Sequence, residues 1–273
     1  KNINLAHYQI EFLVFHEENP HFYRDITNLG GVIHKITSRR KNYIKSKKEL
    51  VEFYRKNNDY DVIHYHLVSF SYPDPILYAP KESKVILHSH IAKLDSNLKV
   101  KILHKLNKSK FLKRADCLLA CSKMAGDFMF NNAKYEVIPN AINFEEYKFN
   151  VKTRMKYKRI FNLDDKVVLG HVGRFETQKN HVYLVDMFKR LIDSNNVNYH
   201  LLLIGEGSLK PEIEQKVLNL NLEEHVTFLG VRSDVKDLLN AIDLFILPSL
   251  YEGLPFVLIE SQVNGAKCIV SDQ

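Results

Sequence analysis

The sequence predicts an α/β protein with two parallel-sheet domains, and two observations carry this prediction. Short apolar runs alternate with longer amphipathic stretches, which is the pattern of strands and crossover helices in parallel sheets. The chain of 273 residues is also too long for a typical single core and suits two compact domains. Residues 201–204 are apolar throughout, as expected for a strand buried on both faces of its sheet.

The expected elements fall into two series, one in each half of the chain. The first series has strands at 10–15, 32–36, 62–66, 85–88, 117–120 and 135–138, and helices at 47–57, 97–111 and 123–130. The second has strands at 167–172, 200–204, 226–229, 244–247 and 268–270, and helices at 181–194, 209–218, 235–241 and 255–264. A polar stretch at 140–165 separates them, so we expect domains at 1–155 and 156–273, facing each other across a cleft.

The composition is ordinary for a globular protein, and it places the chain away from membrane-spanning and secreted classes. No run of 18 apolar residues occurs, so no transmembrane helix is expected. Residues 1–15 lack the small-residue cleavage site of a secretory signal. Cys117, Cys121 and Cys268 do not form a disulfide framework, which favours a reducing, cytoplasmic compartment.

Positive charge is concentrated in the first half of the chain. Residues 1–150 hold 24 Lys and Arg against 16 Asp and Glu, whereas residues 151–273 hold 15 against 16. Dense basic runs lie at 39–48 and 99–114. The simplest explanation of these basic runs is that they form solvated helix faces. A more specific explanation is attraction to anionic lipid headgroups or to an anionic acceptor. The runs lack interleaved aromatic residues, so no nucleic-acid partner is expected.

The strongest segment for chemistry is 249–260 (SLYEGLPFVLIE), directly after a predicted strand. Gly253 permits a tight turn, and Pro255 suits the first turn of a helix, whose free N–H groups form an anion site. Glu252 lies at the turn, and Glu260 is expected about two turns into the helix. Taken alone, Glu252 could equally be an ordinary charge at a helix N-terminus, and Glu260 a solvated residue on the helix surface.

A second segment, 170–180 (GHVGRFETQKN), also follows a predicted strand and precedes a helix. Arg174 and Lys179 therefore lie in a loop at the carboxyl end of a strand, where parallel sheets bind ligands. Two fixed cations beside a helix N-terminus can hold a diphosphate. Two ordinary surface cations are the simpler alternative, but the spacing between this loop and the Glu252 turn favours the diphosphate.

Together these motifs resemble glycosyltransferase family 4, whose members are retaining enzymes of the GT-B fold. In the second half the resemblance is specific in order and spacing: GR at 173–174, KN at 179–180, LIGEG at 203–207, VTFLG at 226–230, and EGLP at 252–255 followed by Glu260. The first half is looser and is most similar to members that build capsular polysaccharides or exopolysaccharides: DVIHYH at 61–66, LHSH at 87–90, ACS at 120–122 and IPN at 138–140.

The resemblance implies a donor site in the second domain. Arg174 and Lys179 would neutralise the donor diphosphate, with Gly173 in the same loop. Glu260 would hold the ribose hydroxyls of the nucleoside. The backbone near the phosphates would come from four consecutive residues: Gly253, Leu254, Pro255 and Phe256.

The resemblance also implies three catalytic residues. Glu252 would bind hydroxyls of the transferred sugar. His88 corresponds best to the family's histidine near that sugar, with His90 as the second choice. No metal ion and no cofactor are expected, because the loop cations would replace a metal at the diphosphate.

The sequence departs from the family pattern in two ways, one at the interdomain turn and one at the two ends of the chain. Ala141 stands where the family usually has glycine after the Pro-Asn of its interdomain turn, which would alter the hinge slightly. The family's opening strand and glycine-rich loop have no counterpart before Gln9, and its later helices have none after Gln273. Residues 1–9 instead read like the tail of a helix. We therefore expect both ends of the natural protein to be missing.

Two histidine pairs leave a metal alternative open. His64 and His66, like His88 and His90, are spaced by two, so each pair shares one face of a strand. Four imidazoles near strand ends could form a zinc site. No carboxylate motif accompanies them, which favours a polar wall beside the donor instead.

The expected function is retaining transfer of a hexose from a nucleoside-diphosphate sugar to a glycan or lipid-linked acceptor in surface polysaccharide synthesis. UDP is the commonest donor nucleotide among the polysaccharide-building members, so a UDP-sugar is expected. The alternatives are a sugar-nucleotide epimerase of the same fold, a non-catalytic partner subunit and a zinc hydrolase. The expected location is cytoplasmic, with peripheral contact at the inner face of an anionic membrane.

Overall fold

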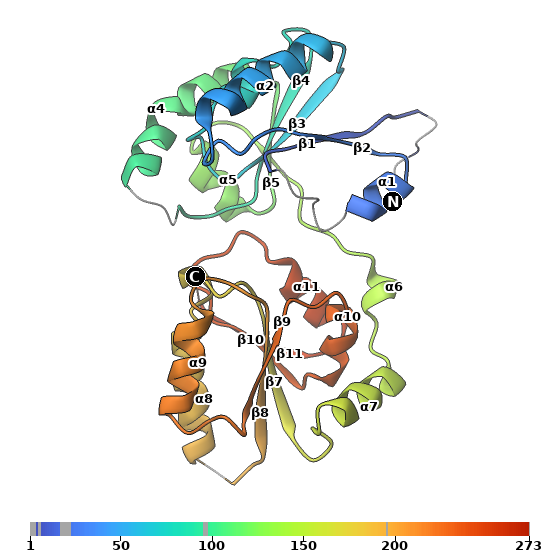
Figure 1. Cartoon of the computed structure of the whole chain (residues 1–273), viewed down its shortest axis with the longest axis vertical. Helices are drawn as coiled ribbons and strands as arrows, with labels where there is room; N and C mark the ends of the chain where they lie inside the picture. The colour runs from blue at the N-terminus through green and yellow to red at the C-terminus, as the bar shows by residue number, and fades with distance from the viewer. Residues whose placement is uncertain (1–3, 5–6, 17–22, 95–97, 195, 273) are drawn as a thin grey trace. The chain divides into compact units, whose positions relative to one another are not determined.

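The computed structural model describes residues 4, 7–16, 23–94, 98–194 and 196–272 (Figure 1). The chain divides into two compact units, one of residues 1–88 and 96–118 and the other of residues 89–95 and 119–273. The expected start of a helix at Asn97 and most of the expected helical tail at 1–9 lie outside the described residues. The expected boundary at 155 and the cleft between the domains stay predictions.

The first half of the chain contains a two-stranded and a four-stranded sheet, with strand orders β1-β2 and β3-β4-β5-β6. Its elements are β1 (Glu11–Val14), α1 (Tyr23–Asn28), β2 (Val32–Lys35), α2 (Tyr43–Lys56), β3 (Val62–Leu67), α3 (Asp74–Leu77), β4 (Lys84–Ser89), α4 (Leu98–Arg114), β5 (Cys117–Ala120), α5 (Lys123–Phe130) and β6 (Glu136–Val137). Strand β1 pairs with β2 in parallel, and β5 pairs likewise with β6.

Side-chain contacts hold the helices of the first unit together. Helix α2 begins where the Asn42 side chain accepts a hydrogen bond from the Lys45 N–H at 3.0 Å. The buried Tyr54 hydroxyl of this helix donates to the Pro75 carbonyl of α3 at 2.9 Å. On α4, the buried Phe111 ring lies 4.8 Å from the Phe70 ring.

The second half of the chain folds around a five-stranded parallel sheet of order β11-β10-β7-β8-β9. Its elements are α6 (Phe144–Tyr147), α7 (Val151–Ile160), β7 (Val167–Val172), η1 (Thr177–Lys179), α8 (His181–Ser194), β8 (Tyr199–Ile204), α9 (Lys210–Asn219), β9 (Val226–Gly230), α10 (Val235–Leu238), η2 (Leu239–Ala241), β10 (Leu244–Leu247), α11 (Phe256–Val263) and β11 (Lys267–Val270).

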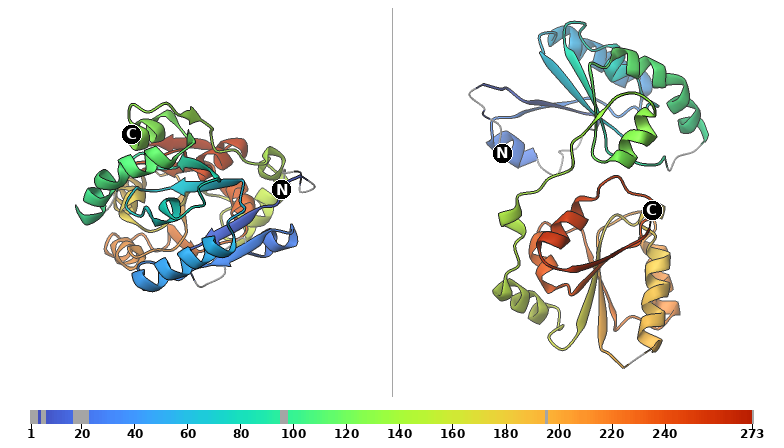
Figure 2. Two further views of the ribbon diagram at one scale, coloured as in Figure 1. Left: turned by 90° about the horizontal axis from the view of Figure 1, so that it is seen from above. Right: turned by 180° about the vertical axis from the view of Figure 1, so that it is seen from behind.

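Helices cover both faces of this sheet. Helices α8 and α9 lie on one face, and α7, α10 and α11 lie on the other (Figures 1 and 2). Alternate residues of β8 point to opposite faces of the sheet. Leu201 and Leu203 pack in one buried cluster, and Leu202 packs in the other. The expectation of a strand buried on both faces at 201–204 is therefore confirmed.

Every expected strand is present, with each end within one residue of its predicted position. The predicted helices at 123–130 and 181–194 are also reproduced, whereas α2 begins four residues before its predicted start. Helices α1, α3, α6 and α7 were not expected. The first three are too short for a helical period to show, and α7 lies in the polar stretch that was expected to separate the domains. In the described part of the chain, no helix is both long and apolar enough to cross a bilayer.

Asp243 anchors α7 to the sheet at the amino ends of β7 and β10. Its carboxylate contacts Arg154 Nη2 at 2.5 Å and Lys158 Nζ at 3.4 Å, and accepts a hydrogen bond from the Val168 N–H at 2.8 Å. Burial raises the pKa of this carboxyl, but the Val168 hydrogen bond and the Arg154 guanidinium outweigh burial, so the pKa lies below its usual value. The basic stretch around residue 155 is thus held on the sheet as a helix.

We predict that Asp243→Ala lowers the free energy of unfolding by about 3 kcal/mol, because it leaves two cations and a backbone N–H without their shared acceptor. Urea unfolding followed by circular dichroism measures this loss. The control is Asp193→Ala, which removes an exposed pair with Lys189 and should cost less than about 1 kcal/mol. Equal losses for the two variants would contradict the anchoring role.

Candidate functional site

The loops at the carboxyl ends of β7, β8 and β9 lie against one another. The Gly173 N–H donates to the Ile204 carbonyl at 2.9 Å, and the Gly205 N–H donates to the Gly230 carbonyl at 2.9 Å. Gly205 has φ +140°, and a Cβ atom there would clash with the Gly173 carbonyl oxygen. Glycine is therefore required where the LIGEG motif passes beneath the loop that carries Arg174.

The two segments predicted to bind the donor are in direct contact. Lys179 Nζ lies 2.7 Å from Glu252 Oε1, and the two side chains are only 16% and 22% exposed. Beside them, the Gln178 side chain donates to the Tyr251 carbonyl at 2.9 Å. The Leu250 N–H donates back to the Gln178 carbonyl at 2.8 Å. The structure thus places the predicted diphosphate ligand Lys179 next to the predicted sugar ligand Glu252.

Arg174 differs from Lys179 in its surroundings. Its side chain is exposed, and it makes no ion pair with any residue that the structure describes. It lies between the half-buried Gly173 and the fully buried Phe175, so its backbone is fixed although its guanidinium faces solvent. A guanidinium in this position can contact an anion at the edge of the sheet.

Glu260 lies in a half-buried environment on α11. Its Oε1 accepts a hydrogen bond from the Tyr147 hydroxyl of α6 at 3.0 Å. Burial raises the pKa of Glu260, and burial together with the nearby Glu260 carboxylate raises the pKa of Tyr147 to about 12. The Asn264 side chain donates to the Tyr147 carbonyl at 3.1 Å, which holds this tyrosine from a second point.

The turn before α11 differs in detail from the expectation. Pro255 is the N-cap residue rather than part of the first turn, and Phe256 is the first helical residue. Glu260 therefore lies just over one turn into the helix, not two. Gly253 and Leu254 form the half-buried turn between β10 and this helix.

Three of the four expected histidines come together. The His64 and His66 rings stack with centroids 4.4 Å apart, and His64 Nε2 lies 3.2 Å from His88 Nδ1. Burial lowers the pKa of His66, which favours its neutral form. His90 follows the end of β4, is half-buried and is not part of this group in the described chain. Of the four imidazoles that could approach one another, the described chain thus groups His64, His66 and His88.

The geometry of the trio bears on the zinc alternative. The candidate ligand nitrogens lie within 4.8 Å of one another. However, the rings are stacked, with interplanar angles of 20° for His64 with His66 and 11° for His64 with His88. Because an imidazole binds a metal in its own plane, near-parallel stacked rings do not direct three nitrogens at one point. The arrangement favours a polar wall, and the absence of a bound metal stays a prediction.

Two buried histidines beneath the Arg174 loop were not singled out from the sequence. His171 Nδ1 lies 2.8 Å from the Ile246 carbonyl oxygen, and the His181 ring stacks on Phe175 at 4.1 Å. Burial lowers the pKa of His171 to about 3 and that of His181 to about 4. In the sequence, His171 lies just before the GR motif and His181 directly follows the KN motif. This proximity to the motifs is the sequence feature that could have pointed to both histidines. Tyr147 offered none, because it lies 113 residues before Glu260.

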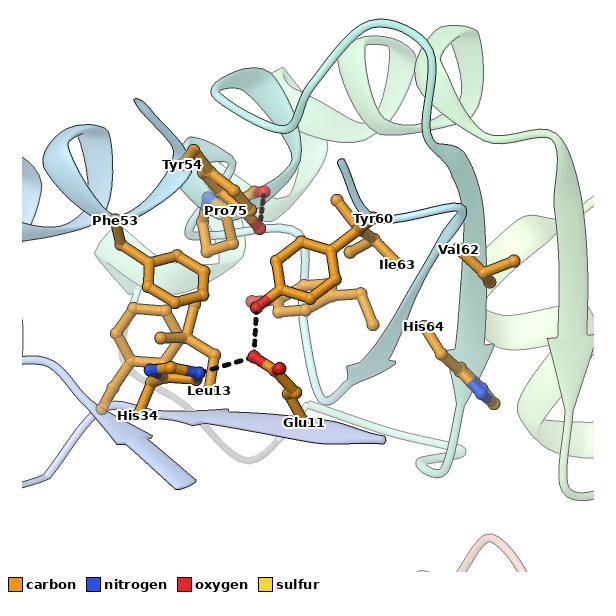
Figure 3. A pocket seen from close by; sticks show the side chains of 12 residues that line it. Glu11, Leu13, His34, Phe53, Tyr54, Tyr60, Val62, Ile63, His64 and Pro75 are labelled. Carbon is orange, nitrogen blue, oxygen red and sulfur yellow. Dashed lines mark hydrogen bonds and ion pairs between the residues drawn. The ribbon is translucent and has the colours of Figure 1, made fainter. Parts of the chain in front are cut away.

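A cavity of about 140 Å³ lies in the first unit, between β1 and β3 (Figure 3). At its wall Glu11 accepts hydrogen bonds from the Tyr60 hydroxyl and from His34 Nε2, each at 2.6 Å. The Tyr60 hydrogen bond is the main reason that the pKa of Glu11 lies below its usual value. No predicted donor-site residue lines this cavity. Sequence reasoning missed this network, whose members come from separate elements.

The fold and the site together define a class of protein. Cations, carboxylates and a helix start gather at the carboxyl edge of a parallel sheet, where α/β proteins bind phosphorylated ligands. The structure is similar to Anabaena Alr3699/HepE solved in complex with UDP and glucose, with a TM-score of 0.79 and 17% identity over 96% of this chain and 73% of that one. It is also similar to sucrose-phosphate synthase from Thermosynechococcus elongatus, with a TM-score of 0.74 and 18% identity over 97% and 81% of the two chains. The expected GT-B fold is thereby confirmed.

Sequence comparison gives the family. The model of glycosyltransferase family 4 matches residues 5–146, and that of glycosyl transferases group 1 matches residues 153–273. The putative glycosyltransferase EpsF of Bacillus subtilis (strain 168) is 30% identical over 276 residues, covering 97% of this chain and 71% of that protein. The chain belongs to glycosyltransferase family 4, as its motifs indicated.

A second relative carries a more specific name. The UDP-Gal:alpha-D-GlcNAc-diphosphoundecaprenol alpha-1,3-galactosyltransferase of Escherichia coli is 28% identical over 242 residues. The match covers 84% of this chain and 62% of that protein. The name describes transfer from a UDP-sugar to a lipid-linked acceptor by that protein.

We predict that His171→Gln makes stability less dependent on pH. The folded-state pKa of His171 is about 3, below the usual 6.5, so as the pH falls below 6.5 the unfolded chain takes up a proton that the folded chain excludes. This imidazole contributes stability that is present above pH 6.5 and is lost as the pH falls toward 3, by about 1.4 kcal/mol per pH unit. The substitution should remove that share of the slope.

Urea unfolding at several pH values between 6.5 and 4.5 measures the slope. His7→Gln, at an exposed position, is the matched control. An identical slope for His171→Gln and the parent chain would show that His171 does not stay neutral in the folded state.

Proposed function

We propose that this glycosyltransferase moves a hexose from a UDP-sugar to a hydroxyl of a glycan or lipid-linked acceptor, with retention of configuration, in the synthesis of a surface polysaccharide. The contact between Lys179 and Glu252 is the observation that carries this proposal, because it joins the predicted diphosphate and sugar ligands in one place. The E. coli relative, named for a UDP-Gal donor and a diphosphoundecaprenol acceptor, supports the choice of both substrates.

The proposed site stabilises the leaving diphosphate electrostatically. As the bond between the sugar carbon and the phosphate oxygen breaks, the sugar becomes oxocarbenium-like and the diphosphate gains negative charge. Arg174, Lys179 and the N–H groups at the start of α11 lie at the edge where this charge develops. Lys179 and the backbone N–H groups are held in place before the reaction, so they stabilise the charge with little reorganisation, and Arg174 adds a solvent-facing cation. In this proposal no metal ion or cofactor takes part.

Glu252 and Glu260 have separate roles in the proposal. Glu252 accepts hydrogen bonds from the hydroxyls of the transferred sugar while its other contact, Lys179, faces the phosphates. Glu260 accepts hydrogen bonds from the two ribose hydroxyls, and Tyr147 orients its carboxylate. The backbone of Gly253, Leu254, Pro255 and Phe256 lies beside the phosphates.

The proposal also assigns roles to histidines of the first half of the chain. His88 contacts the transferred sugar, and the hydrogen bond with His64 fixes the orientation of the His88 ring. His90 is the second candidate for this contact. The acceptor hydroxyl attacks on the face from which the diphosphate leaves, and a phosphate oxygen takes its proton. The enzyme acts in the cytoplasm, peripherally at the inner face of an anionic membrane.

We predict that calorimetric titration of the chain with UDP, GDP and ADP, without divalent metal, detects binding of UDP. Glu260→Ala should weaken UDP binding by at least about 10-fold, because a charged hydrogen-bond acceptor to ribose is lost. Glu214→Ala on α9, where the side chain is 45% exposed, is the control and should bind UDP like the parent chain. Equal UDP affinity in both variants would contradict the ribose assignment.

We predict that Arg174→Ala lowers the turnover of sugar transfer by about 100-fold, comparable with the loss of one preorganised donor to a developing negative charge. Transfer of labelled sugar from the UDP-sugar to a lipid-linked acceptor measures turnover. Arg190→Ala, at an exposed position on α8, is the matched control. Turnover of Arg174→Ala within threefold of the parent contradicts the diphosphate assignment. Conversion of the nucleotide sugar without any acceptor would instead indicate an epimerase.

A further inference from the structure

Helix α4 carries a row of apolar side chains that no other part of the described chain covers. Leu98, Ile102 and Leu106 are 72%, 49% and 65% exposed. They are spaced by four residues, so they lie along one line of the helix. Three large aliphatic side chains in one exposed row are more than the scattered surface apolar residues that need no explanation.

The opposite side of α4 is fixed to the first unit, which keeps the row directed outward. Phe111 is fully buried there, and His104 Nδ1 accepts a hydrogen bond from the Phe70 N–H at 3.1 Å. At the end of the helix, Arg114 donates to the Pro80 carbonyl at 2.7 Å. Figures 1 and 2 show α4 at the outside of this unit. The exposed row therefore cannot turn inward without breaking these contacts.

The charged residues of α4 are all positive. Helix α4 contains seven Lys and Arg residues and no Asp or Glu. Five of its lysines are exposed: Lys99, Lys101, Lys105, Lys110 and Lys113. Within the residues that the structure covers, none of the five is in an ion pair, whereas on α2 Lys45 pairs with Glu49 and Lys56 pairs with Glu52. The positive charge of these five lysines is thus not neutralised by ion pairs, although Arg114 at the end of α4 pairs with Asp116.

We infer that this face of α4, formed by the apolar row and the exposed lysines, binds an anionic lipid surface. A helix with aliphatic side chains flanked by lysines can lie in the headgroup region, with its apolar side chains buried and its cations near lipid phosphates. A second copy of the chain would bring the same positive face, so self-association through this face is repelled. The row has no aromatic side chain on which a nucleic-acid base could stack.

This inference adds a specific surface to the peripheral membrane contact included in the proposed function. Its test measures binding to vesicles and not sugar transfer, so each proposal can fail without the other. A chain that binds vesicles but not UDP would contradict the donor site alone. A chain that binds UDP but not vesicles would contradict the α4 surface alone.

The experiment is co-sedimentation of the chain with vesicles of phosphatidylglycerol and phosphatidylcholine, and with vesicles of phosphatidylcholine alone, at low salt. We expect binding only to the anionic vesicles. The charge variant Lys101→Gln/Lys105→Gln/Lys110→Gln should lower the partition coefficient by about 100-fold, since each cation near an anionic leaflet contributes about fivefold. The apolar variant Leu98→Gln/Ile102→Gln/Leu106→Gln should lower it by at least about 10-fold.

Leu218→Gln is the matched control, because Leu218 is 49% exposed on α9, which also carries Glu212 and Glu214. This variant should bind vesicles like the parent chain. Circular dichroism establishes that all variants fold. Absence of parental binding to anionic vesicles, or parental affinity in either triple variant, overturns the inference. A parental dimer that the apolar variant dissociates would assign the row to a protein contact and overturn it as well.

Discussion

The order of strands in the five-stranded sheet is the constraint on which the candidate site depends. Strand β10 lies directly beside β7, with Leu244 opposite Leu169, although the two strands are more than 70 residues apart in the sequence. Because parallel strands end at the same edge, the loops that follow them meet there. The ion pair between Lys179 and Glu252 is the result of this adjacency. A different strand order would leave both side chains as ordinary surface charges.

Beneath that edge, burial keeps positive charge out of the sheet and leaves it on the loop. His171 and His181 are desolvated, and the nearby Lys179 cation lowers their pKa further, so both imidazoles are neutral at ordinary pH. The cations available to an anionic ligand are then Arg174 and Lys179, one exposed and one already facing a carboxylate. This division suits the proposed binding of a diphosphate with sugar hydroxyls beside it.

The two halves of the chain differ in charge. The second half is nearly neutral and carries the donor motifs, whereas the excess of Lys and Arg lies in the first half. On α2 part of that excess is balanced by glutamates one turn away, whereas on α4 Arg114 pairs with Asp116 and the five exposed lysines are in no ion pair with a described residue. A basic composition therefore produces a partly neutralised surface on α2 and a more positive one on α4.

The sequence by itself determined the α/β class, all eleven strands of the described chain and the motifs that identify the family. These features are local, since apolar runs, glycines and helix starts act through neighbouring residues. It also marked Arg174, Lys179, Glu252 and Glu260 as a donor site through resemblance, although the assignment of their roles stays a prediction.

Only the tertiary structure decided which of these side chains touch. The hydrogen bond of Tyr147 to Glu260, the anchoring of α7 by Asp243 and the network of Glu11 with Tyr60 and His34 join residues distant in sequence. No periodicity records such pairs, because they depend on strand order and on how helices pack across the sheet. Burial also depends on the tertiary structure. His171 is neutral because the elements packed around it exclude water, and not because of its neighbours in the sequence.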